Sequence, residues 1–596
     1  MSIHKLLPLV LFIVTANAVN KHTTTPPMGW NSYNHYSCYA NETQIQSNAQ
    51  ALVDLGLASV GYTYVVPDCG WSAKTRTSEG KITWNETFYP SGFPALGKKL
   101  HSLGLMFGIY SGAGTWQCHP EGANYLIQAS LGHEKEDAQT FSDWGGDYLK
   151  YDNCWADGKN FVVYYPNETD PSARFRKMAT EIDAVPRDFV YGICQWGVGN
   201  NLERWASKIG NNWRMSNDIT NAWHSIFRIT NQVVPLARYS KPGGYNDMDM
   251  LMVGNGVLTP EESRTHFSIW AMEKSPLFIG AALENNLLDA DALKIFSNKE
   301  VVAINQDLLG RAAELVRRFS EEEYDVWAGP LAGDGMVVAV INWGATERNI
   351  TINLPDVGIQ SAKKARDVWA ATDLDGLDTT YSALIPSHGV KLLRLEGLTK
   401  AGEYTGKIGS DGTAFKNVYA FTSSSNYTIT ITPATASRVS LIIDGKNPIT
   451  RPVSRSGIIT DVSLSAGLHE LRVSSRTKSL RLALSDFSKE YQDAPASLSF
   501  NVDSTISGSK VVDVSYINYD LSFDKAWSGE GLNVLNATFS VNGGKGKTWR
   551  FPISGQSWEE VGTMRIELDG FRNGRNVVNI TGVEGKMIVK GVEIWG

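Results

Sequence analysis

The chain has 596 residues, of which 20% are charged, with a formal net charge of -7 and an isoelectric point near 5.9. This length is several times the usual domain size, so two to four domains are expected. The mildly acidic balance leaves no basic stripe, which argues against nucleic acid and anionic membrane surfaces as partners.

The first eighteen residues have the pattern of a signal peptide. Lys5 precedes the apolar run 6–14, and Ala16-Asn17-Ala18 is a small-x-small cleavage pattern. No later stretch is long and apolar enough to cross a bilayer, so the sequence predicts a soluble protein that is secreted to the extracellular space. Asn-x-Ser/Thr acceptor sites fit that compartment and predict several glycans. These sites are Asn41, Asn85, Asn167, Asn349, Asn426, Asn536 and Asn579.

The five cysteines all lie in the first third of the chain. They are Cys38, Cys69, Cys118, Cys154 and Cys194. An odd number leaves at least one free thiol or an intermolecular bond. No Cys-x2-Cys pair or Cys/His cluster has zinc spacing, so disulfides are favoured over a metal site.

Residues 24–317 alternate short strand-like runs with stretches of helical periodicity, which is the pattern of parallel β/α units. The expected strands are 28–30, 62–67, 105–110, 148–151, 189–194, 213–216, 245–248 and 276–279. A closed barrel of ~250 residues needs about eight such strands. The sequence therefore predicts an α/β fold, with a (β/α)8 TIM barrel at 19–312 after a signal peptide at 1–18.

Short alternating strands with Gly, Asn and Ser turns follow the barrel, and they predict antiparallel β modules. Run 390–395 is the expected closing strand of a β-sandwich at 313–397. A β-rich module at 398–490 and a β-sandwich at 491–596 are expected next, either as two domains or as one domain with a long insertion. Core packing is the commoner role for the tryptophans of this end, but some on a solvent face would form a carbohydrate-binding module. These tryptophans are Trp527, Trp549, Trp558 and Trp595.

Two aspartates follow expected barrel strands that lie two β/α repeats apart. Asp152 comes after the strand at 148–151, and Asp218 follows the run from Trp213 to Asn217. Strand ends of a barrel meet at its catalytic rim, and retaining glycoside cleavage needs two carboxyl groups, one to attack and one to protonate the leaving oxygen. The alternative role for either aspartate is to cap the next helix.

Neighbouring charges suggest how the two carboxyl groups divide these roles. Lys150 is expected on the same side of its strand as Asp152, where a cation lowers a carboxylate pKa and keeps a nucleophile ionised. Asp218 is the candidate general acid, which burial or a second carboxylate would favour. Arg214 would act in the opposite direction on Asp218.

Five motifs in order resemble glycoside hydrolase family 27, which contains α-galactosidases and α-N-acetylgalactosaminidases. The resemblance covers about 24–310, with a family-like β-sandwich to about 397. The motifs are TPPMGWNSYNH at 25–35, FGIYSGAGT at 107–115, YLKYDNC at 148–154, WRMSNDI at 213–219 and GGYNDMDML at 243–251.

The resemblance implies a two-step retaining mechanism with Asp152 as the nucleophile and Asp218 as the general acid/base. It implies that Trp30 stacks on the sugar, that Lys150 binds ring hydroxyls and that Arg214 holds the 2-hydroxyl side. It also implies disulfides Cys38–Cys69 and Cys118–Cys154 and a free Cys194. No cofactor or metal is expected, because acid–base and covalent carboxylate chemistry suffices. The further substrate-binding residues that it implies are Asp68, Tyr110, Cys118, Gln195, Asp249 and Met250.

Three positions depart from the family pattern. The family usually has two adjacent aspartates before Cys and Trp to grip the 4- and 6-hydroxyls, whereas this chain has Pro67-Asp68-Cys69-Gly70-Trp71. If Cys69 matches the family cysteine, Pro67 replaces the first aspartate; if Trp71 is matched instead, Cys69 replaces the second. Gln195 stands where glutamate is frequent, and Met248 replaces a proline. Either alignment alters the hydroxyl contacts and so the specificity.

The sequence thus predicts a secreted retaining exo-glycosidase that acts on terminal α-D-galactosyl residues of oligosaccharides or polysaccharides. One alternative is a β-L-arabinopyranosidase, since that sugar is α-D-galactopyranose without its hydroxymethyl group. The other is a non-catalytic carbohydrate-binding protein whose C-terminal β region binds the sugar.

Overall fold

The computed structural model describes most of the chain. The described residues are 23–157, 159, 172–197, 202–319, 323–405, 407–409, 412–420, 424–432, 437–453, 457–465, 467–474, 481–485, 489–493, 499–504, 507–519, 533–555 and 560–595. The expected signal peptide, Asn167, Trp527 and Trp558 lie outside them. Within the described part, no helix combines the length and apolar character needed to span a membrane.

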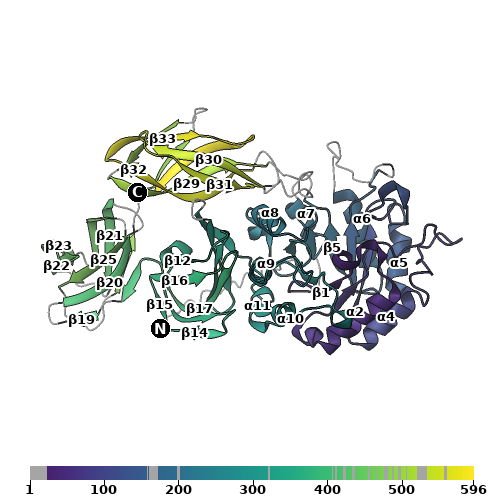
Figure 1. The fold of residues 1–596 in the computed structure, drawn as a ribbon. Helices are drawn as coiled ribbons and strands as arrows, with labels where there is room; N and C mark the ends of the chain where they lie inside the picture. Colours follow the sequence, from purple (N-terminus) through teal and green to yellow (C-terminus); the bar gives the residue numbers. More distant parts are fainter. Residues whose placement is uncertain are drawn as a thin grey trace, which may run out of the picture.

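Eight parallel strands form the first sheet, in the order β7-β6-β5-β4-β3-β2-β1-β8 (Figure 1). An isolated parallel bridge between Leu251, after β7, and Ile279 of β8 joins the two ends of this sheet. The predicted barrel is thus confirmed. Its strands are β1 Met28–Asn31, β2 Tyr64–Val66, β3 Met106–Gly112, β4 Tyr148–Asp152, β5 Val190–Cys194, β6 Asn212–Arg214, β7 Tyr245–Asp247 and β8 Leu277–Ile279.

Helices surround this sheet on its outer face and the strands' own side chains fill the inner one, so the strands consist largely of buried residues. Local sequence sets the helix starts: Asn41 and Thr259 each accept a hydrogen bond from the backbone N–H three residues on, as N-caps do. The helices are α1 Tyr33–Tyr36, α2 Glu42–Asp54, α3 Leu57–Val60, α4 Phe93–Ser102, α5 Glu134–Asp143, α6 Ser172–Ala184, α7 Leu202–Ala206, α8 Trp223–Val233, α9 Pro260–Met272, α10 Ala290–Phe296 and α11 Lys299–Asn305.

An antiparallel sheet follows the barrel, with the strand order β12-β16-β15-β13-β17-β11-β10-β9 and β14 paired to β13. It has its own apolar core, as a separate packed layer requires. The strand expected at 390–395 is β17, which continues through Gly397 to Lys400. The strands are β9 Glu314–Phe319, β10 Tyr324–Leu331, β11 Gly335–Asn342, β12 Arg348–Asn353, β13 Ile359–Asp367, β14 Thr372–Leu374, β15 Leu377–Asp378, β16 Thr380–Ile385 and β17 Val390–Lys400.

Two further pairs of antiparallel sheets complete the described chain. One pair has the orders β18-β26-β21-β24 and β19-β20-β25-β22-β23. Its strands are β18 Glu403–Thr405, β19 Lys407–Gly409, β20 Gly412–Ala420, β21 Ser424–Thr432, β22 Ser437–Ile443, β23 Ile449–Val453, β24 Ile458–Leu464, β25 Gly467–Val473 and β26 Arg481–Ser485.

The second pair, here called the C-terminal module, has the orders β27-β34-β29-β32 and β28-β33-β30-β31. Its strands are β27 Lys489–Asp493, β28 Ser499–Ser504, β29 Gly508–Ile517, β30 Val534–Val541, β31 Lys547–Pro552, β32 Gly562–Phe571, β33 Gly574–Thr581 and β34 Ile588–Trp595. The two pairs have separate apolar cores. Trp549 is 6% exposed and belongs to the second core, so a sugar-binding face built on this residue is not supported.

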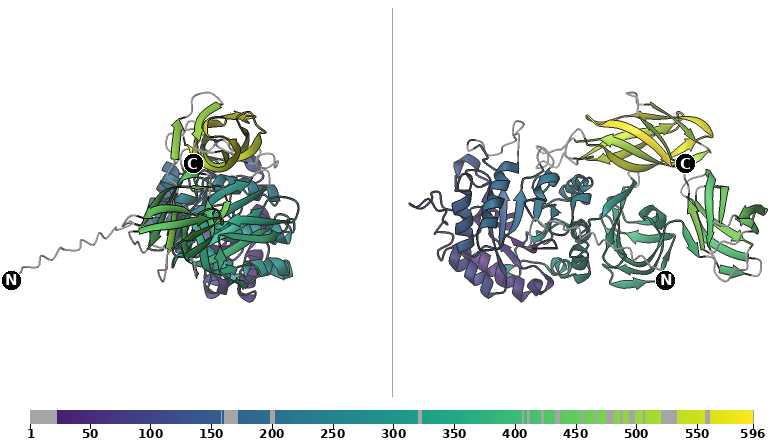
Figure 2. Two further views of the ribbon diagram at one scale, coloured as in Figure 1. Left: turned by 90° about the vertical axis from the view of Figure 1, so that its left-hand side faces the viewer. Right: turned by 180° about the vertical axis from the view of Figure 1, so that it is seen from behind.

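The C-terminal module lies over the β9–β17 sheet and extends toward the barrel near α8, in views from both sides (Figures 1 and 2). The pair formed by β18–β26 lies beyond the β9–β17 sheet, on the side away from the barrel. The two C-terminal units therefore have different neighbours.

Candidate active site

A cavity of about 320 Å³ opens at the carboxyl ends of the barrel strands. Five of its lining residues come from different strand ends: Tyr33 after β1, Asp68 after β2, Asp152 in β4, Asp218 after β6 and Asp249 after β7. This is the face on which barrels of this type carry their chemistry.

Asp152 ends β4 and is 8% exposed, with hydrogen-bond donors on both carboxylate oxygens. The Tyr110 hydroxyl donates to Oδ2 at 2.8 Å, and the indole Nε1 of Trp196 donates to Oδ1 at 2.9 Å. The backbone N–H of Asn153 also donates to Oδ1, at 2.8 Å. Burial raises the pKa of Asp152 above its ordinary value, and this effect outweighs the opposing charge of Lys150.

Asp218 lines the same cavity with a side chain that is 30% exposed. Arg214 donates to its Oδ1 at 2.6 Å. The guanidinium of Arg228 donates to the backbone carbonyl of Asp218 at 2.9 Å. Asp218 therefore keeps access to the cavity while both its side chain and its backbone are held.

Asp249 and Arg214 form a buried ion pair with 3.0 Å between Oδ1 and Nη1. The backbone N–H groups of Ile219 and Met250 donate to the Asp249 carboxylate at 2.7 and 2.8 Å. Asp249 has a φ of 82°, a conformation that costs about 1–3 kcal/mol for a residue other than glycine and is common at functional sites. Burial raises the pKa of this carboxyl group.

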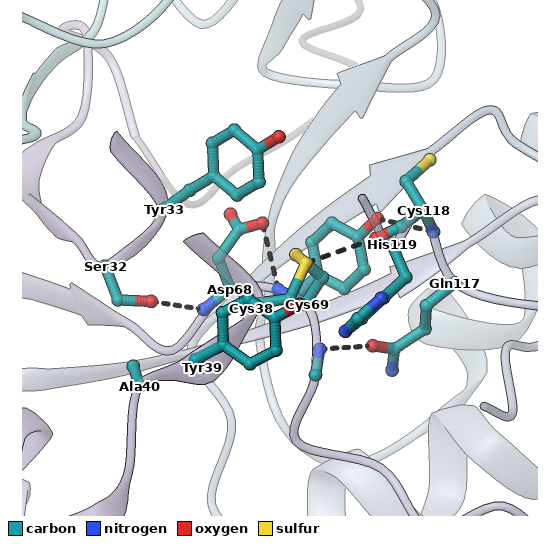
Figure 3. The surroundings of a disulfide bond; sticks show 12 residues. Ser32, Tyr33, Cys38, Tyr39, Ala40, Asp68, Cys69, Gln117, Cys118 and His119 are labelled. Carbon is teal, nitrogen blue, oxygen red and sulfur yellow. Dashed lines mark hydrogen bonds between the residues drawn. A yellow bond between two sulfur atoms is a disulfide. The ribbon is translucent and has the colours of Figure 1, made fainter. Parts of the chain in front are cut away.

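Asp68 is the centre of a second polar group in the cavity. Its Oδ2 accepts hydrogen bonds from Asn31 Nδ2 and from Lys150 Nζ, both at 2.7 Å. Figure 3 shows the Asp68 carboxylate beside the Tyr33 ring, next to the Cys38–Cys69 disulfide. Lys150 and Asp152 both line the cavity, so the same-side placement expected from strand alternation is what the structure shows.

Disulfides join Cys38 to Cys69 and Cys118 to Cys154, the two pairs implied by the family resemblance. Cys194 is free and buried. Because Cys69 forms the disulfide, the alignment on this cysteine is favoured, with Asp68 in the place of the second family aspartate and Pro67 in that of the first. Cys118, Tyr110 and Met250 line the cavity as expected.

The structure corrects two of the expected sugar contacts. Trp30 is 0% exposed, does not line the cavity, and donates from Nε1 to the carbonyl of Ala281 at 2.8 Å, so it cannot stack on a sugar there. Gln195 is 3% exposed and is also absent from the cavity lining. The two side chains are packed inside the protein.

Sequence reasoning missed five residues that line the cavity: Tyr33, His119, Pro120, Trp196 and Asn217. Trp196 stands two residues after β5, a strand that was expected, so its place at a strand end was an available signal. Nothing in the sequence indicated that its ring nitrogen would reach Asp152. Within the described residues, no three His, Cys, Asp or Glu side chains gather as a metal site would require.

An eight-stranded barrel with two carboxyl groups facing one cavity is an architecture typical of glycoside hydrolases. Residues 25–307 match the family model described as "Alpha galactosidase A", and residues 321–395 match the one described as "Alpha galactosidase C-terminal beta sandwich domain". The chain is 40% identical to α-galactosidase D of Emericella nidulans over 622 aligned residues, with 94% of this chain and 93% of the relative covered. The chain therefore belongs to glycoside hydrolase family 27, the α-galactosidase family.

Solved structures match about two thirds of the chain. α-Galactosidase I from Mortierella vinacea is 32% identical with a TM-score of 0.58, covering 64% of this chain and all of that one. α-Galactosidase from Saccharomyces cerevisiae, solved with raffinose, is 29% identical with a TM-score of 0.58, covering 64% of this chain and 99% of that one. These matches confirm the fold class and the recognition of the family.

Proposed function

We propose that the protein hydrolyses terminal α-D-galactosyl residues of oligosaccharides with retention of configuration, using Asp152 and Asp218. The observation that carries this proposal is the shared cavity: both carboxyl groups line it, from strand ends two β/α units apart. Family membership supports the α-galactosyl substrate, and the raffinose complex of the yeast enzyme supports an oligosaccharide.

The two steps divide between the two carboxyl groups. The Asp152 carboxylate attacks the anomeric carbon while Asp218 gives its proton to the glycosidic oxygen, so that the C–O bond breaks and the aglycone leaves as an alcohol. The deprotonated Asp218 then takes a proton from a water molecule, whose oxygen attacks the same carbon and releases Asp152. The donors from Tyr110 and Trp196 hold the Asp152 oxygens in a fixed orientation for the attack.

The remaining polar groups are placed to bind the sugar hydroxyls. Asp68 with Lys150 offers a carboxylate and an ammonium to one side of the ring, and Arg214 with Asp249 offers the same pair of charges to the other. Met250 adds an apolar contact. Sites that hydrogen-bond particular hydroxyls discriminate strongly between sugars.

The position of Pro67 favours one alternative substrate. It removes a carboxylate from the place where the family grips the 4- and 6-hydroxyls, and a β-L-arabinopyranoside lacks the exocyclic hydroxymethyl group. The alternative function is therefore a β-L-arabinopyranosidase with the same two catalytic residues.

Secretion and the limits of the units belong to the same proposal. The pattern at 1–18 and the two disulfides support an extracellular protein. None of the described acceptor side chains is buried: Asn349 is exposed, and Asn41, Asn85, Asn536 and Asn579 are half-buried. The proposed units are 19–312, 313–397, 398–490 and 491–596. The last two have separate cores, and the change from a parallel barrel to an antiparallel sheet supports the division between the first two, which share part of the largest core.

The test is the initial rate on p-nitrophenyl α-D-galactopyranoside and on p-nitrophenyl β-L-arabinopyranoside, with Asp152→Asn as the control. Faster cleavage of the galactoside, lost in Asp152→Asn, is the expected result. Faster cleavage of the arabinoside would establish the alternative. No turnover of either sugar, with binding retained, would instead indicate a carbohydrate-binding protein.

A further inference from the structure

The C-terminal module makes direct contact with the barrel, although the family models end at residue 395 and the solved structures cover 64% of this chain. One of its contact residues on the barrel side is Asn533, which immediately precedes β30 and is 3% exposed. Helix α8 forms the barrel side of this contact. Figures 1 and 2 show the module reaching toward α8 from above the β9–β17 sheet.

We propose that the C-terminal module contributes to catalysis by positioning Asp218. Asn533 of the module is the positioning residue, and it acts through α8 on the loop from Met215 to Asp218, here called the Asp218 loop. This inference rests on the general acid/base role proposed for Asp218. Two hydrogen-bond paths lead from Asn533 to the segment between β6 and Asp218.

The first path runs through Gln232. Asn533 Nδ2 donates to Gln232 Oε1 at 3.2 Å, and Gln232 Nε2 donates to the carbonyl of Met215 at 2.7 Å. Met215 directly follows β6 and precedes Asp218 by three residues. Since Gln232 is 3% exposed, the loss of either partner would leave a buried amide group unsatisfied.

The second path runs through Arg228. Asn533 Nδ2 also lies 3.4 Å from the carbonyl of Arg228, to which it donates. The Arg228 guanidinium, on a side chain that is 1% exposed, donates to the carbonyl of Asp218 at 2.9 Å. One asparagine of the module therefore contacts both α8 residues that hold the Asp218 loop.

Other polar contacts join both the module and α8 to β9, and the module to α7. Arg318 of β9 donates to Asn231 of α8 at 2.7 Å, and its neighbour Arg317 lies 3.4 Å from Glu567 of the module. Arg204 of α7 forms an ion pair with Glu560 of the module. The Arg318–Asn231 contact is buried, whereas the side chains of Arg204 and Glu567 are 56% and 45% exposed, so these two ion pairs add only weakly to the fixed orientation of the module.

The position of Asp218 matters most when the leaving group needs a proton. A small displacement of a catalytic group lowers the rate of the step in which it acts. Nitrophenolate is a weak base and departs with little protonation, whereas a sugar alkoxide departs only as the protonated alcohol. A misplaced acid therefore slows cleavage of a disaccharide more than cleavage of an aryl glycoside.

The experiment compares kcat/KM on p-nitrophenyl α-D-galactopyranoside and on a galactosyl-α-1,6-glucose disaccharide, using the full chain. Asn533→Ala is expected to lose about 10-fold or more on the disaccharide and less than about 3-fold on the aryl glycoside. Gln232→Met is expected to show the same selectivity. The double variant is expected to lose no more than the larger single effect, because both residues act in one path.

Asn542→Ala is the matched control. Asn542 also has a left-handed backbone, with a φ of 52° against 55° for Asn533, and it donates to Gly570 and Asn576 inside the same module. This variant should keep the wild-type ratio of kcat/KM for the two substrates even if it lowers the unfolding temperature.

Two results would overturn the inference. One is an equal loss of kcat/KM on both substrates, and the other is an unchanged ratio of the two kcat/KM values in both Asn533→Ala and Gln232→Met. Asp218→Ala separates this result from a failure of the proposed function. If Asp218→Ala shows the selective loss and the Asn533 variant does not, only the positioning role is wrong. If Asp218→Ala shows no selectivity, Asp218 is not the acid and both proposals fall.

Discussion

At the scale of single residues, the environment of Asp152 balances two opposing effects. Its burial favours the neutral acid and raises the pKa, while each donor from Tyr110, Trp196 and the Asn153 backbone favours the carboxylate. A nucleophile must be ionised to attack. The donors therefore determine how far the acid side of the pH range stays open for catalysis.

Trp196→Phe removes one of these donors and leaves most of the ring volume in place. Loss of a hydrogen bond to the ionised form raises the pKa of Asp152, so the acid limb of kcat/KM on the aryl galactoside is expected to move to higher pH by about one unit. The measurement is the pH profile of kcat/KM in both proteins. Trp155→Phe, in the same aromatic cluster but outside the cavity lining, is the control and should leave the limb in place. An unshifted limb in Trp196→Phe would contradict the hydrogen bond.

The contrast between Trp30 and Trp196 shows where residue-level prediction from this sequence ends. The neighbour of Trp30 in β1, Asn31, turns its side chain to Asp68, so alternation directs Trp30 to the opposite face, where it packs in the core. Trp196 has a φ of 73°, a conformation that no periodic pattern predicts. Strand-end carboxylates could be found because strand ends are visible in the sequence, but an indole that reaches back to one of them could not.

At the scale of elements, the strand and helix pattern was predictable and the loop contacts were not. All eight barrel strands could be predicted from short apolar runs between helical stretches. The wall of the cavity, in contrast, is formed by loops whose positions depend on disulfides and hydrogen bonds. The Cys118–Cys154 disulfide joins the loop after β3 to the end of β4. The backbone N–H of Cys118 donates to the Tyr110 hydroxyl at 3.2 Å, and that hydroxyl donates to Asp152.

Replacing Cys118 and Cys154 together by serine should lower the free energy of unfolding by ~3–4 kcal/mol, since the bond closes a loop across a sequence separation of 36 residues. The Cys38→Ser, Cys69→Ser double variant is the matched comparison, because its separation of 31 residues predicts nearly the same loss. Denaturant unfolding of both variants measures this. The Cys118/Cys154 variant should also lower kcat more than the other variant does, through Tyr110, whereas loss of the Cys38–Cys69 bond beside Asp68 should act mainly on KM. A loss in kcat of the same size in both variants would contradict the link from Cys118 to Asp152.

At the scale of the whole molecule, the order of the units could be predicted and their docking could not. Alternating strands with turn residues indicated β modules after the barrel. The contacts between units depend on a few polar side chains, such as Asn533 and Arg317, which resemble any other polar surface residue in the sequence. The electrostatic interaction between charged groups of different units also depends on how the units dock. The change of folding stability with pH therefore cannot be predicted from the sequence of one unit alone.

Glu273 is the clearest example of a titratable group whose pKa depends on the docking of two units. It caps the C-terminus of α9 beside the junction of barrel and β9, is 0% exposed, and its carboxyl oxygens have no hydrogen-bond partner among the described residues. Burial raises its pKa well above the ordinary value, and Glu314 adds to this. As pH rises above about 4.3, the unfolded chain releases this proton while the folded chain keeps it, so the folded state loses stability. Burial lowers the pKa of the neighbouring Lys274 to about 8. Its contribution to stability therefore varies with pH only near and above pH 8.

Glu273→Gln should therefore leave stability unchanged near pH 4 and raise it near pH 7, because an amide of nearly the same shape has no proton to lose. The difference between the two proteins should grow by roughly 1.4 kcal/mol per pH unit from about pH 4.5 upward, until the pH reaches the pKa of the folded state. Denaturant midpoints of both proteins at several pH values from about 4 to about 7 measure it. Glu347→Gln, at an exposed position, should run parallel to the parent throughout. A Glu273→Gln curve that also stays parallel would mean that Glu273 is ionised in the folded protein, so that the barrel and the β9–β17 sheet are packed around a charge.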